Sequence, residues 1–259
     1  MKRIIIALAM LLVMSLSAAA WGNLGHSTVI KIAERHLTRK AKENIAKYFD
    51  YDIVEDASWM DRHRNDDNID FTTYWHVYPV MESGHYDPNP RMKNGDCIRA
   101  LHLCDANLSN YTELTDSAVV MNVRMLIHFV GDMHCPSHAY FPGKRNFWEC
   151  RLDTLWQGTF HGFYDRSPMF IYADRTPVEI AEMLDSNASV FAVANVSKGT
   201  FEDWAYERAQ ADRVIYEINP PGTYDLDPAT VWKSSSLVNE SLRLAGYRLA
   251  FLLNKYFDK

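Results

Sequence analysis

Beyond its first twenty residues, the sequence has no apolar run long enough to span a bilayer, and it has no low-complexity segment. It has no repeat of fixed period, which argues against solenoid and propeller architectures, and no evident domain linker. Basic residues are fewer than acidic ones, 27 Lys and Arg against 33 Asp and Glu, so we do not expect a basic face that binds nucleic acid non-specifically. The 259 residues suffice for one sizeable core and are too few for two large domains.

The first twenty residues have the anatomy of a secretory signal. Two basic residues open the segment, residues 4–14 are almost wholly apolar, and a run of mainly small side chains ends at Ala20. The alternative is a membrane anchor, but the apolar run is well short of the roughly 20 residues that a span needs. We therefore expect a signal peptide over 1–20 and a single mature domain over 21–259. The protein would be secreted or periplasmic, with no membrane anchor after processing.

An exported chain can form disulfides, and this one has four cysteines: Cys97, Cys104, Cys135 and Cys150. Four cysteines allow three pairings, and the sequence does not choose among them. If the segment from Cys97 to Cys104 is helical, these two Cα atoms lie about 10 Å apart. That separation is too large for a bridge, so this pair is disfavoured.

Hydrophobic periodicity predicts a mainly helical chain. The expected helices are His26–Leu37, Arg39–Tyr48, Ile53–His63, Cys97–Tyr111, Thr115–His134, Pro177–Ser189, Gly199–Ile218 and Pro228–Tyr256. Thr38, Asp96 and Thr115 precede three of these segments and are of the types that cap helix N-termini.

Two segments between the predicted helices have a different composition. Residues 65–94 contain many Asn, Asp, Pro and Gly and are expected to be mostly loop. Residues 140–176 are rich in aromatics, Gly and Pro, and a hairpin is expected near 156–158. The predicted fold is all-α, a helical bundle with long loops at one end.

Histidine and aspartate recur at a spacing that suits metal binding. His128 and Asp132 are four residues apart, which places them on one helix face with Cβ atoms about 5–6 Å apart. His138 follows just beyond the predicted helix end, and His161 and Asp165 repeat the four-residue spacing. Imidazole and carboxylate groups on one stripe suit zinc.

Two further groups extend this pattern. Asp61 is followed fifteen residues later by His76, and the expected mature terminus begins with Trp21 and reaches His26 after five residues. A free α-amine at Trp21 would be a nitrogen donor. Each group alone is more often a surface pair or a satisfied core pair. The occurrence of all of them in one exported chain favours a metal centre.

The sequence resembles the zinc-dependent single-strand nucleases and 3′-nucleotidases of the S1/P1 nuclease family. The segments that carry the resemblance are Trp21-Gly-x-x-Gly-His26, Ala57-Ser-Trp-x-Asp61, Trp75-His76, His128-Phe-x-Gly-Asp132-Met-His-x-Pro-x-His138, His161-x-x-x-Asp165 and Gly246-Tyr-Arg-Leu-Ala250. They span essentially the whole expected mature chain. The first segment and the one from His128 to His138 are the most specific. The resemblance implies a helical fold of the phospholipase C/P1 nuclease type.

The resemblance also implies three zinc ions. One would be held by Asp61, His76, His128 and Asp132, a second by His26 and the amine and carbonyl of Trp21 with Asp132 bridging, and a third by His138, His161 and Asp165. Residues 152–157 also resemble the family's segment around the last two ligands, but they have Asp and Gln at the metal positions. His161 and Asp165 have the expected residue types and are therefore preferred.

The sequence departs from the family pattern at three positions. Pro79 stands three residues after His76, where some relatives carry a carboxylate. Cys135 and Ser137 replace the usual Gln and Leu between His134 and His138. These changes put the substrate preference in question.

The implied activity is hydrolysis of single-stranded DNA or RNA, or of 3′-nucleotides, to products with 5′ phosphates. Asp132 would act through the shared metal pair, which lowers the pKa of a water, and Arg64 could donate to the phosphate. Tyr78 and Tyr140 are expected to be exposed and could stack on a base. Packing or solvation explains these last three residues equally well. No stable protein partner is implied.

Two other functions remain in competition. An exported zinc phospholipase C would share the fold and most ligands, but the bacterial phospholipases have Glu where this chain has Asp165. A non-catalytic binding protein on the same fold would bury unpaired His and Asp side chains at a cost. The sequence therefore favours the nuclease.

Overall fold

Helices account for most of the computed structural model, which describes residues 21–88, 94–144 and 146–259. Two short two-stranded sheets are the other regular elements of this described part. The prediction of an all-α fold is confirmed. The predicted signal peptide over 1–20 lies outside the described residues.

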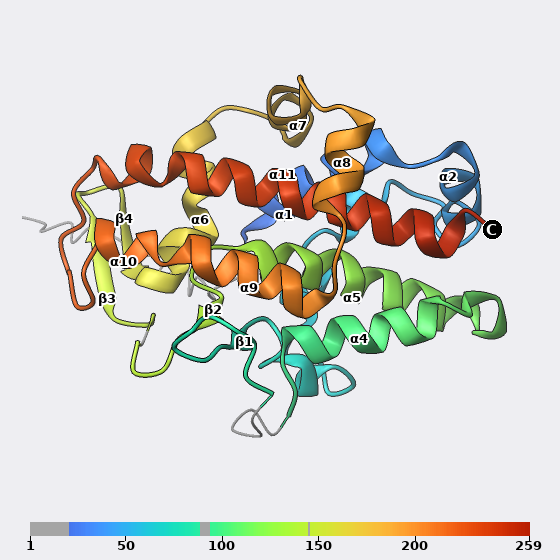
Figure 1. Cartoon of the computed structure of the whole chain (residues 1–259), viewed down its shortest axis with the longest axis horizontal. Helices are drawn as coiled ribbons and strands as arrows, with labels where there is room; N and C mark the ends of the chain where they lie inside the picture. The colour runs from blue at the N-terminus through green and yellow to red at the C-terminus, as the bar shows by residue number, and fades with distance from the viewer. Residues whose placement is uncertain (1–20, 89–93, 145) are drawn as a thin grey trace, which may run out of the picture.

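The helices and strands follow one another along the chain as drawn in Figure 1. The α-helices are α1 (Asn23–His36), α2 (Arg39–Ile45), α3 (Trp59–His63), α4 (Cys97–Leu108), α5 (Asp116–His134), α6 (Phe160–Tyr172), α7 (Pro177–Asp185), α8 (Val190–Val196), α9 (Phe201–Asp212), α10 (Val214–Ile218) and α11 (Thr230–Phe257). Single 3-10 turns are η1 (Ile53–Asp56), η2 (Asp70–Thr72) and η3 (Tyr111–Glu113). The strands are β1 (Tyr78–Pro79), β2 (Ala139–Tyr140), β3 (Glu149–Leu152) and β4 (Trp156–Thr159).

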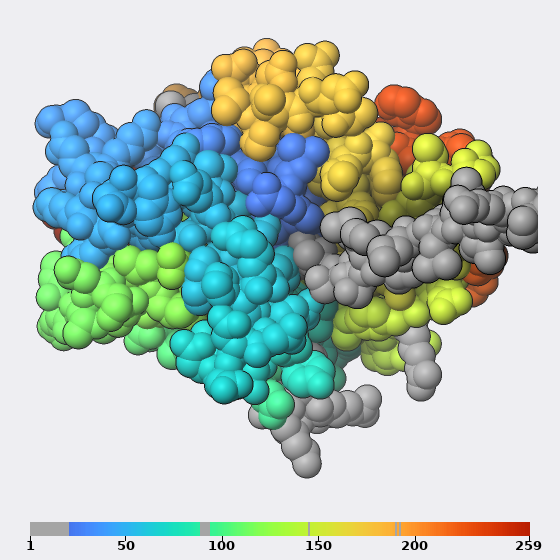
Figure 2. Space-filling model, turned by 180° about the vertical axis from the view of Figure 1, so that it is seen from behind, coloured from blue at the N-terminus to red at the C-terminus, as the bar shows by residue number. Residues whose placement is uncertain are grey.

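The long helix α11 runs the length of the molecule and packs against both α1 and α5 (Figure 1). Its buried side chains recur every three or four residues, as in Leu242, Ala245 and Leu249, which is the stripe expected of a helix packed on a core. Gly246 lets α1 approach closely, because a Cβ atom there would clash with Ile32. Figure 2 shows the opposite face, where the first described residues, in dark blue, lie between the gold segment of α7 and the cyan segment that follows α2.

The three predicted capping residues begin the helices expected of them. Thr38 Oγ1 accepts from the backbone N–H of Ala41 at 3.0 Å, and Thr115 Oγ1 accepts from that of Ala118 at 3.3 Å. The Asp96 carboxylate accepts from two backbone N–H groups at the start of α4. Each cap satisfies donors that the first helical turn leaves unpaired, which contributes about 1 kcal/mol.

The predicted hairpin is present, but some helix predictions were wrong. Strands β3 and β4 pair antiparallel with Leu152 opposite Trp156. The segment predicted as one helix over 53–63 is instead η1 followed by α3, and α9 and α10 are separate at Arg213. Residues 140–176 contain a helix that the composition concealed, α6, which begins at a Thr159 cap and includes Pro168. Helix α8 was also missed.

The small sheet of β1 and β2 joins two loops that are distant in the sequence. The strands are parallel, with Tyr78 opposite Ala139. The backbone N–H of Tyr78 donates to the carbonyl of His138 at 3.1 Å, and that of Val80 donates to the carbonyl of Tyr140 at 3.0 Å. This pairing fixes the segment that follows His76 beside the segment that follows His138.

The described helices and the four cysteines bear on membrane spans and on disulfides. None of the described helices combines the length and the apolar character needed to cross a membrane. The four cysteines all lie among the described residues, and each is a free, buried thiol. The structure therefore contains no disulfide among them, although the sequence allowed one.

Candidate metal centre

Helix α5 supplies the central pair of the site. His128 and Asp132 lie one turn apart on its inner face, and both side chains are fully buried. Nε2 of His128 lies 3.3 Å from Oδ2 of Asp132. The neighbouring Phe129, Val130 and Met133 pack into the hydrophobic core. The four-residue spacing therefore does what the sequence predicted, turning both polar groups to one side.

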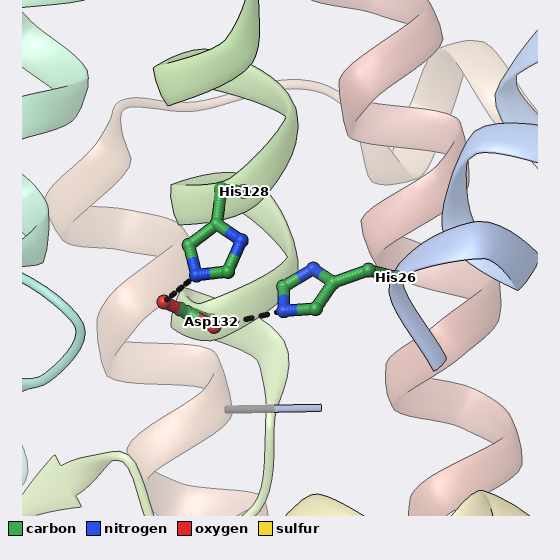
Figure 3. A group of neighbouring side chains, drawn as sticks. All are labelled: His26, His128 and Asp132. Atoms are coloured by element: carbon green, nitrogen blue, oxygen red, sulfur yellow. Dashed lines mark ion pairs between the residues drawn. The ribbon is translucent and has the colours of Figure 1, made fainter. Parts of the chain in front are cut away.

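Helix α1 brings His26 to the other oxygen of this carboxylate. Nε2 of His26 lies 3.3 Å from Oδ1 of Asp132, and its ring stacks on that of His128 with centroids 4.2 Å apart. Figure 3 shows each imidazole directed at a different oxygen of Asp132. Gly131 makes this approach possible, because a Cβ atom there would lie 2.6 Å from Nδ1 of His26.

Asp61 and His76 complete this first group. Nδ1 of His76 lies 2.9 Å from Oδ2 of Asp132 and 3.7 Å from Oδ1 of Asp61. Oδ1 of Asp61 is also 3.7 Å from Nε2 of His128. Asp132 therefore stands between two sets of donors, with His26 facing one oxygen and His76 and His128 facing the other.

A second group lies around Asp165 on α6. Its Oδ1 is 3.0 Å from Nε2 of His138, and its Oδ2 is 3.6 Å from Nε2 of His161. The Sγ atom of Cys135 is 3.7 Å from the same Oδ1. Ligand atoms of Cys135, His138 and Asp165 all lie within 4.8 Å of one another. The sequence anticipated the two histidines here but not the cysteine.

Trp21 lies at the edge of this second group. Its side chain is fully buried, and its ring packs so closely on Gly25 that a Cβ atom there would lie 2.6 Å from Cε3. The next residue, Gly22, donates its backbone N–H to the carbonyl of Asp165 at 2.7 Å. Burial and the charge of Asp165 raise the pKa of the Cys135 thiol well above its ordinary value, and a hydrogen bond from the Trp21 backbone N–H opposes this rise.

Backbone carbonyls orient two of the imidazoles. Nδ1 of His128 lies 3.3 Å from the carbonyl of Ala57, and Nδ1 of His138 lies 2.7 Å from the carbonyl of His76. These contacts engage Nδ1 of each ring and leave Nε2 as the atom that faces the carboxylates. Metal-binding histidines use this arrangement to fix their tautomer.

The pKa values of the two carboxylates in the first group are shifted in opposite directions. Burial raises the pKa of Asp61 well above its ordinary value, and the charge of Asp132 raises it further. Burial also opposes ionisation of Asp132, but the attraction of His128 and His76 outweighs it and holds the pKa of Asp132 well below its usual range. Asp132 is therefore the anion at the centre of the group.

The imidazoles are also displaced from their ordinary behaviour. Burial lowers the pKa of His128 well below 6.5 and that of His161 to about 4. Burial opposes the charged form of His138 as well, but the hydrogen bond and charge of Asp165 raise its pKa to about 9. His128 and His161 are thus neutral lone-pair donors at neutral pH.

Many of the donor atoms are buried without a hydrogen-bond partner, which a metal ion would supply with a ligand bond. Buried atoms without a hydrogen-bond partner include both ring nitrogens of His26, both oxygens of Asp61, Nε2 of His76, Oδ1 of Asp132 and Oδ2 of Asp165. Leaving such a group unpaired costs about 1–3 kcal/mol, and a cation within reach would satisfy several at once. Imidazole nitrogen and carboxylate oxygen are ligands that zinc takes. These residues could therefore hold metal ions.

The sequence can now be compared with known families. The model of the S1/P1 nuclease family matches residues 21–258. This chain belongs to the S1/P1 nuclease family. The match covers almost all the described residues, including every histidine and aspartate of both groups.

Two curated proteins are similar to this S1/P1 family member. Endonuclease 4 of Arabidopsis thaliana is 30% identical over 141 residues, which are 49% of this chain and 47% of that protein. Nuclease S1 of Aspergillus oryzae is 26% identical over 132 residues, which are 46% of this chain and 44% of that protein. The chain thus spans somewhat less than half the length of each curated relative it matches.

The predicted substrate-binding residues of this S1/P1 family member are Arg64, Tyr140 and Tyr78, and they differ from one another in burial and in neighbours. Arg64 ends α3, and its charge lowers the pKa of Asp61 against the larger effect of burial. Tyr140 is half-buried, with its ring centroid 6.4 Å from that of His161. The expectation that Tyr78 is exposed was wrong, because it is fully buried in the β1–β2 pairing and donates to the carbonyl of Met133 at 3.3 Å.

An aromatic that the sequence analysis missed lies beside the second group. Phe147 is 51% exposed, and its ring is 4.9 Å from that of His161 with 33° between the planes. Its edge also meets Tyr140 at 5.8 Å. Nothing in the local sequence distinguishes Phe147 from the many other aromatics of residues 140–176.

Proposed function

We propose that this protein is a zinc-dependent phosphodiesterase that hydrolyses single-stranded nucleic acid or 3′-nucleotides and leaves 5′-phosphate products. The observation that carries the proposal is the position of Asp132. This carboxylate is fully buried and has imidazoles of His26, His76 and His128 around its two oxygens. Such a residue is suited to join two ions.

Three zinc ions would account for the donors. Asp61, His76, His128 and Asp132 would hold the first, Trp21, His26 and Asp132 the second, and His138, His161 and Asp165 the third. Bound zinc would supply a nucleophile from water at neutral pH and neutralise the phosphate. Asp132 would keep the first two ions together, and the neighbouring imidazoles that lower its pKa favour its charged form.

Arg64 would bind the substrate phosphate. It follows Asp61 by three residues at the end of α3, so a phosphate held at the first ion would lie within reach of its guanidinium. Arginine makes charge-assisted, often bidentate, hydrogen bonds to phosphate oxygens. Tyr140, half-buried near His161, is the remaining proposed contact for a base.

A substrate panel together with metal analysis tests this function. Protein purified without chelator should contain close to three zinc ions per chain and lose activity with chelator. It should hydrolyse single-stranded DNA, RNA or 3′-AMP well above phosphatidylcholine. A better rate on the lipid would instead identify a phospholipase C. A well-folded protein with almost no metal and no hydrolysis would indicate a binding protein.

The proposal includes the route of the protein through the cell. Removal of residues 1–20 would release a mature chain that begins at Trp21, secreted or periplasmic, without a membrane anchor. The mature chain over 21–259 would act as one catalytic domain without a stable protein partner. Mass spectrometry of the protein isolated from its natural compartment should find Trp21 as the first residue, and an intact leader would contradict this part.

A further inference from the structure

Cys135 differs from the other cysteines in what its sulfur faces. Cys97 Sγ lies 3.2 Å from the carbonyl of Phe129, as a weak donor inside the core. Cys104 and Cys150 are buried in the hydrophobic cluster on α4 and β3. Sγ of Cys135 lies 3.5 Å from the carbonyl of Pro136 and 3.7 Å from Oδ1 of Asp165, beside His138. Of the four cysteines, all within the described residues, it alone shares a group with other metal-binding side chains.

The spacing of these atoms matches donors around one ion. Two ligands held tetrahedrally at about 2.0–2.3 Å from a zinc ion lie about 3.5 Å from each other. The carboxylate Oδ1 of Asp165 is 3.0 Å from Nε2 of His138 and 3.7 Å from Sγ of Cys135. Both distances are close to that value, and ligand atoms of all three residues lie within 4.8 Å of one another.

A second observation points to a cation at this place. Oδ2 of Asp165 belongs to a side chain only 1% exposed and has no hydrogen-bond partner. This atom faces His161 Nε2 at 3.6 Å, while Oδ1 faces His138 and Cys135. An ionised oxygen buried without a partner is costly. A metal ion near the carboxylate would remove that cost.

Cys135 is held in position by the end of α5. Its backbone N–H donates to the carbonyls of Gly131 and Asp132, both at 3.0 Å, so the residue is the last one fixed by the helix. The next residue but one, Ser137, has a positive φ of 77°, which turns the chain sharply. The turn brings His138 back towards Asp165, and Cys135 and His138 meet on the same side of that carboxylate.

We propose that Cys135 is a sulfur ligand of the metal ion held by His138 and Asp165. The proposal rests on the metal centre proposed above and adds a donor that the family resemblance does not supply. On binding, the bond that forms joins the metal to Sγ, the Sγ–H bond breaks, and the proton leaves to the buffer. With His161, the group then offers one sulfur, two nitrogens and one oxygen, all of kinds that zinc binds.

A sulfur ligand changes which ions the group retains. Thiolate favours soft ions such as Zn²⁺ and Cd²⁺, whereas carboxylate and water favour Mg²⁺ and Mn²⁺. The group around Asp165 should therefore keep Cd²⁺ more tightly than the group around Asp61 and His76, which has only nitrogen and oxygen donors.

Cadmium titration of the zinc-depleted mature protein tests the proposal directly. A cadmium–thiolate bond gives a charge-transfer absorption in the ultraviolet that nitrogen and oxygen ligands do not give. We expect the wild type to develop this band to one thiolate per chain. Cys135→Ser should lose it and bind cadmium at this group at least tenfold more weakly, while Cys150→Ser, a buried cysteine outside the group, should retain both.

Cadmium NMR of the wild type gives a reading that needs no variant, because a sulfur ligand moves the resonance far downfield. Full cadmium loading with neither a thiolate band nor a downfield resonance would overturn the assignment of Cys135 and leave the metal centre standing. A band that persists in Cys135→Ser would overturn it too. Failure of the folded wild type to bind any cadmium or zinc would contradict both this inference and the proposed function.

Discussion

The imidazole of His26 occupies the space that a Cβ atom on Gly131 would need. Such an atom would lie 2.6 Å from Nδ1 of the ring. The two residues come from different helices, α1 and α5, so a single missing methyl group allows a histidine from the start of the chain to reach the carboxylate of Asp132, 3.3 Å away.

Gly131→Ala should displace His26 and release about one metal ion per chain. A misplacement of about 1 Å at a catalytic centre costs on the order of 10²-fold in rate, and we expect a loss of that size in kcat/KM. Gly246→Ala is the matched control. Gly246 lies on α11, and a Cβ atom there would clash with Ile32 on α1, the helix that also carries His26. The control should lose about 1–3 kcal/mol of stability and keep its metal. Full metal content in Gly131→Ala would contradict the role of His26.

Asp132→Asn should be more damaging than Asp165→Asn. The carboxylate of Asp132 faces three imidazoles, from His26, His76 and His128, whereas that of Asp165 faces two. We therefore expect Asp132→Asn to lose two ions and Asp165→Asn one, with the larger fall in kcat/KM on single-stranded DNA for the first. Equal losses in metal and in rate would argue against a bridging carboxylate.

An extra residue before Trp21 should inactivate the mature protein. The indole of Trp21 is fully buried and its backbone nitrogen points at Cys135, so this end of the chain already lies at the centre. Only a free amine, with a pKa of about 8, can bind zinc through nitrogen. Protein that retains Met before Trp21 should fold, hold about one ion fewer and lose most activity. Equal zinc and equal kcat/KM in the two proteins, with both termini verified by mass spectrometry, would remove Trp21 from the site.

Asp185 should make the stability of the fold pH-dependent away from the metal centre. Burial opposes its ionisation, but hydrogen bonds from Arg35, His36 and Tyr247 outweigh burial and lower its pKa below 3.8. A lowered carboxyl pKa stabilises the folded state above the ordinary value, and this stability is lost as the pH falls through the folded-state pKa. Asp185→Asn should therefore cost about 1–3 kcal/mol at pH 7.

Urea unfolding at several pH values measures this effect. The difference between Asp185→Asn and wild type should shrink as the pH falls from 3.8 through the lower folded-state pKa, below which the carboxyl of Asp185 is also neutral. The free energy of unfolding of Asp56→Asn serves as a comparison, because this variant removes another buried carboxylate, which pairs with Arg124 at 2.8 Å. A difference for Asp185→Asn that stays constant down to the acid limit would show that the contribution is packing rather than charge.

Local signals in the sequence were enough to predict much of the helical framework. Thr38, Asp96 and Thr115 each begin a helix because a side-chain oxygen satisfies N–H groups within three residues, a purely local interaction. The spacing of His128 and Asp132 is likewise local, since α-helix geometry alone puts them on one face. These parts required no knowledge of distant contacts.

Long-range packing decided what the sequence analysis missed. Tyr78 is buried because its strand pairs with Ala139, sixty-one residues away in the chain, and no neighbouring residue indicates this. Cys135 acquires its surroundings from Asp165 on another helix. Helix α6 was missed because Gly162 and Pro168 resemble loop residues, although Thr159 caps the helix and its inner face is packed in the core.

The parallel pairing of β1 with β2 has a consequence for the order in which segments of the molecule would unfold. It fastens residues 78–79, which follow His76, to residues 139–140, which follow His138. The other histidine and aspartate donors come from α1, α3, α5 and α6. Ions shared among such distant segments act as removable crosslinks that close long loops, and each closure restricts the unfolded chain. Chelation should therefore loosen α1 and the segment around His76 first, with hydrogen exchange rising there while α4 and α11 stay protected. In such a protein the ions that serve catalysis would also hold distant segments of the folded chain together.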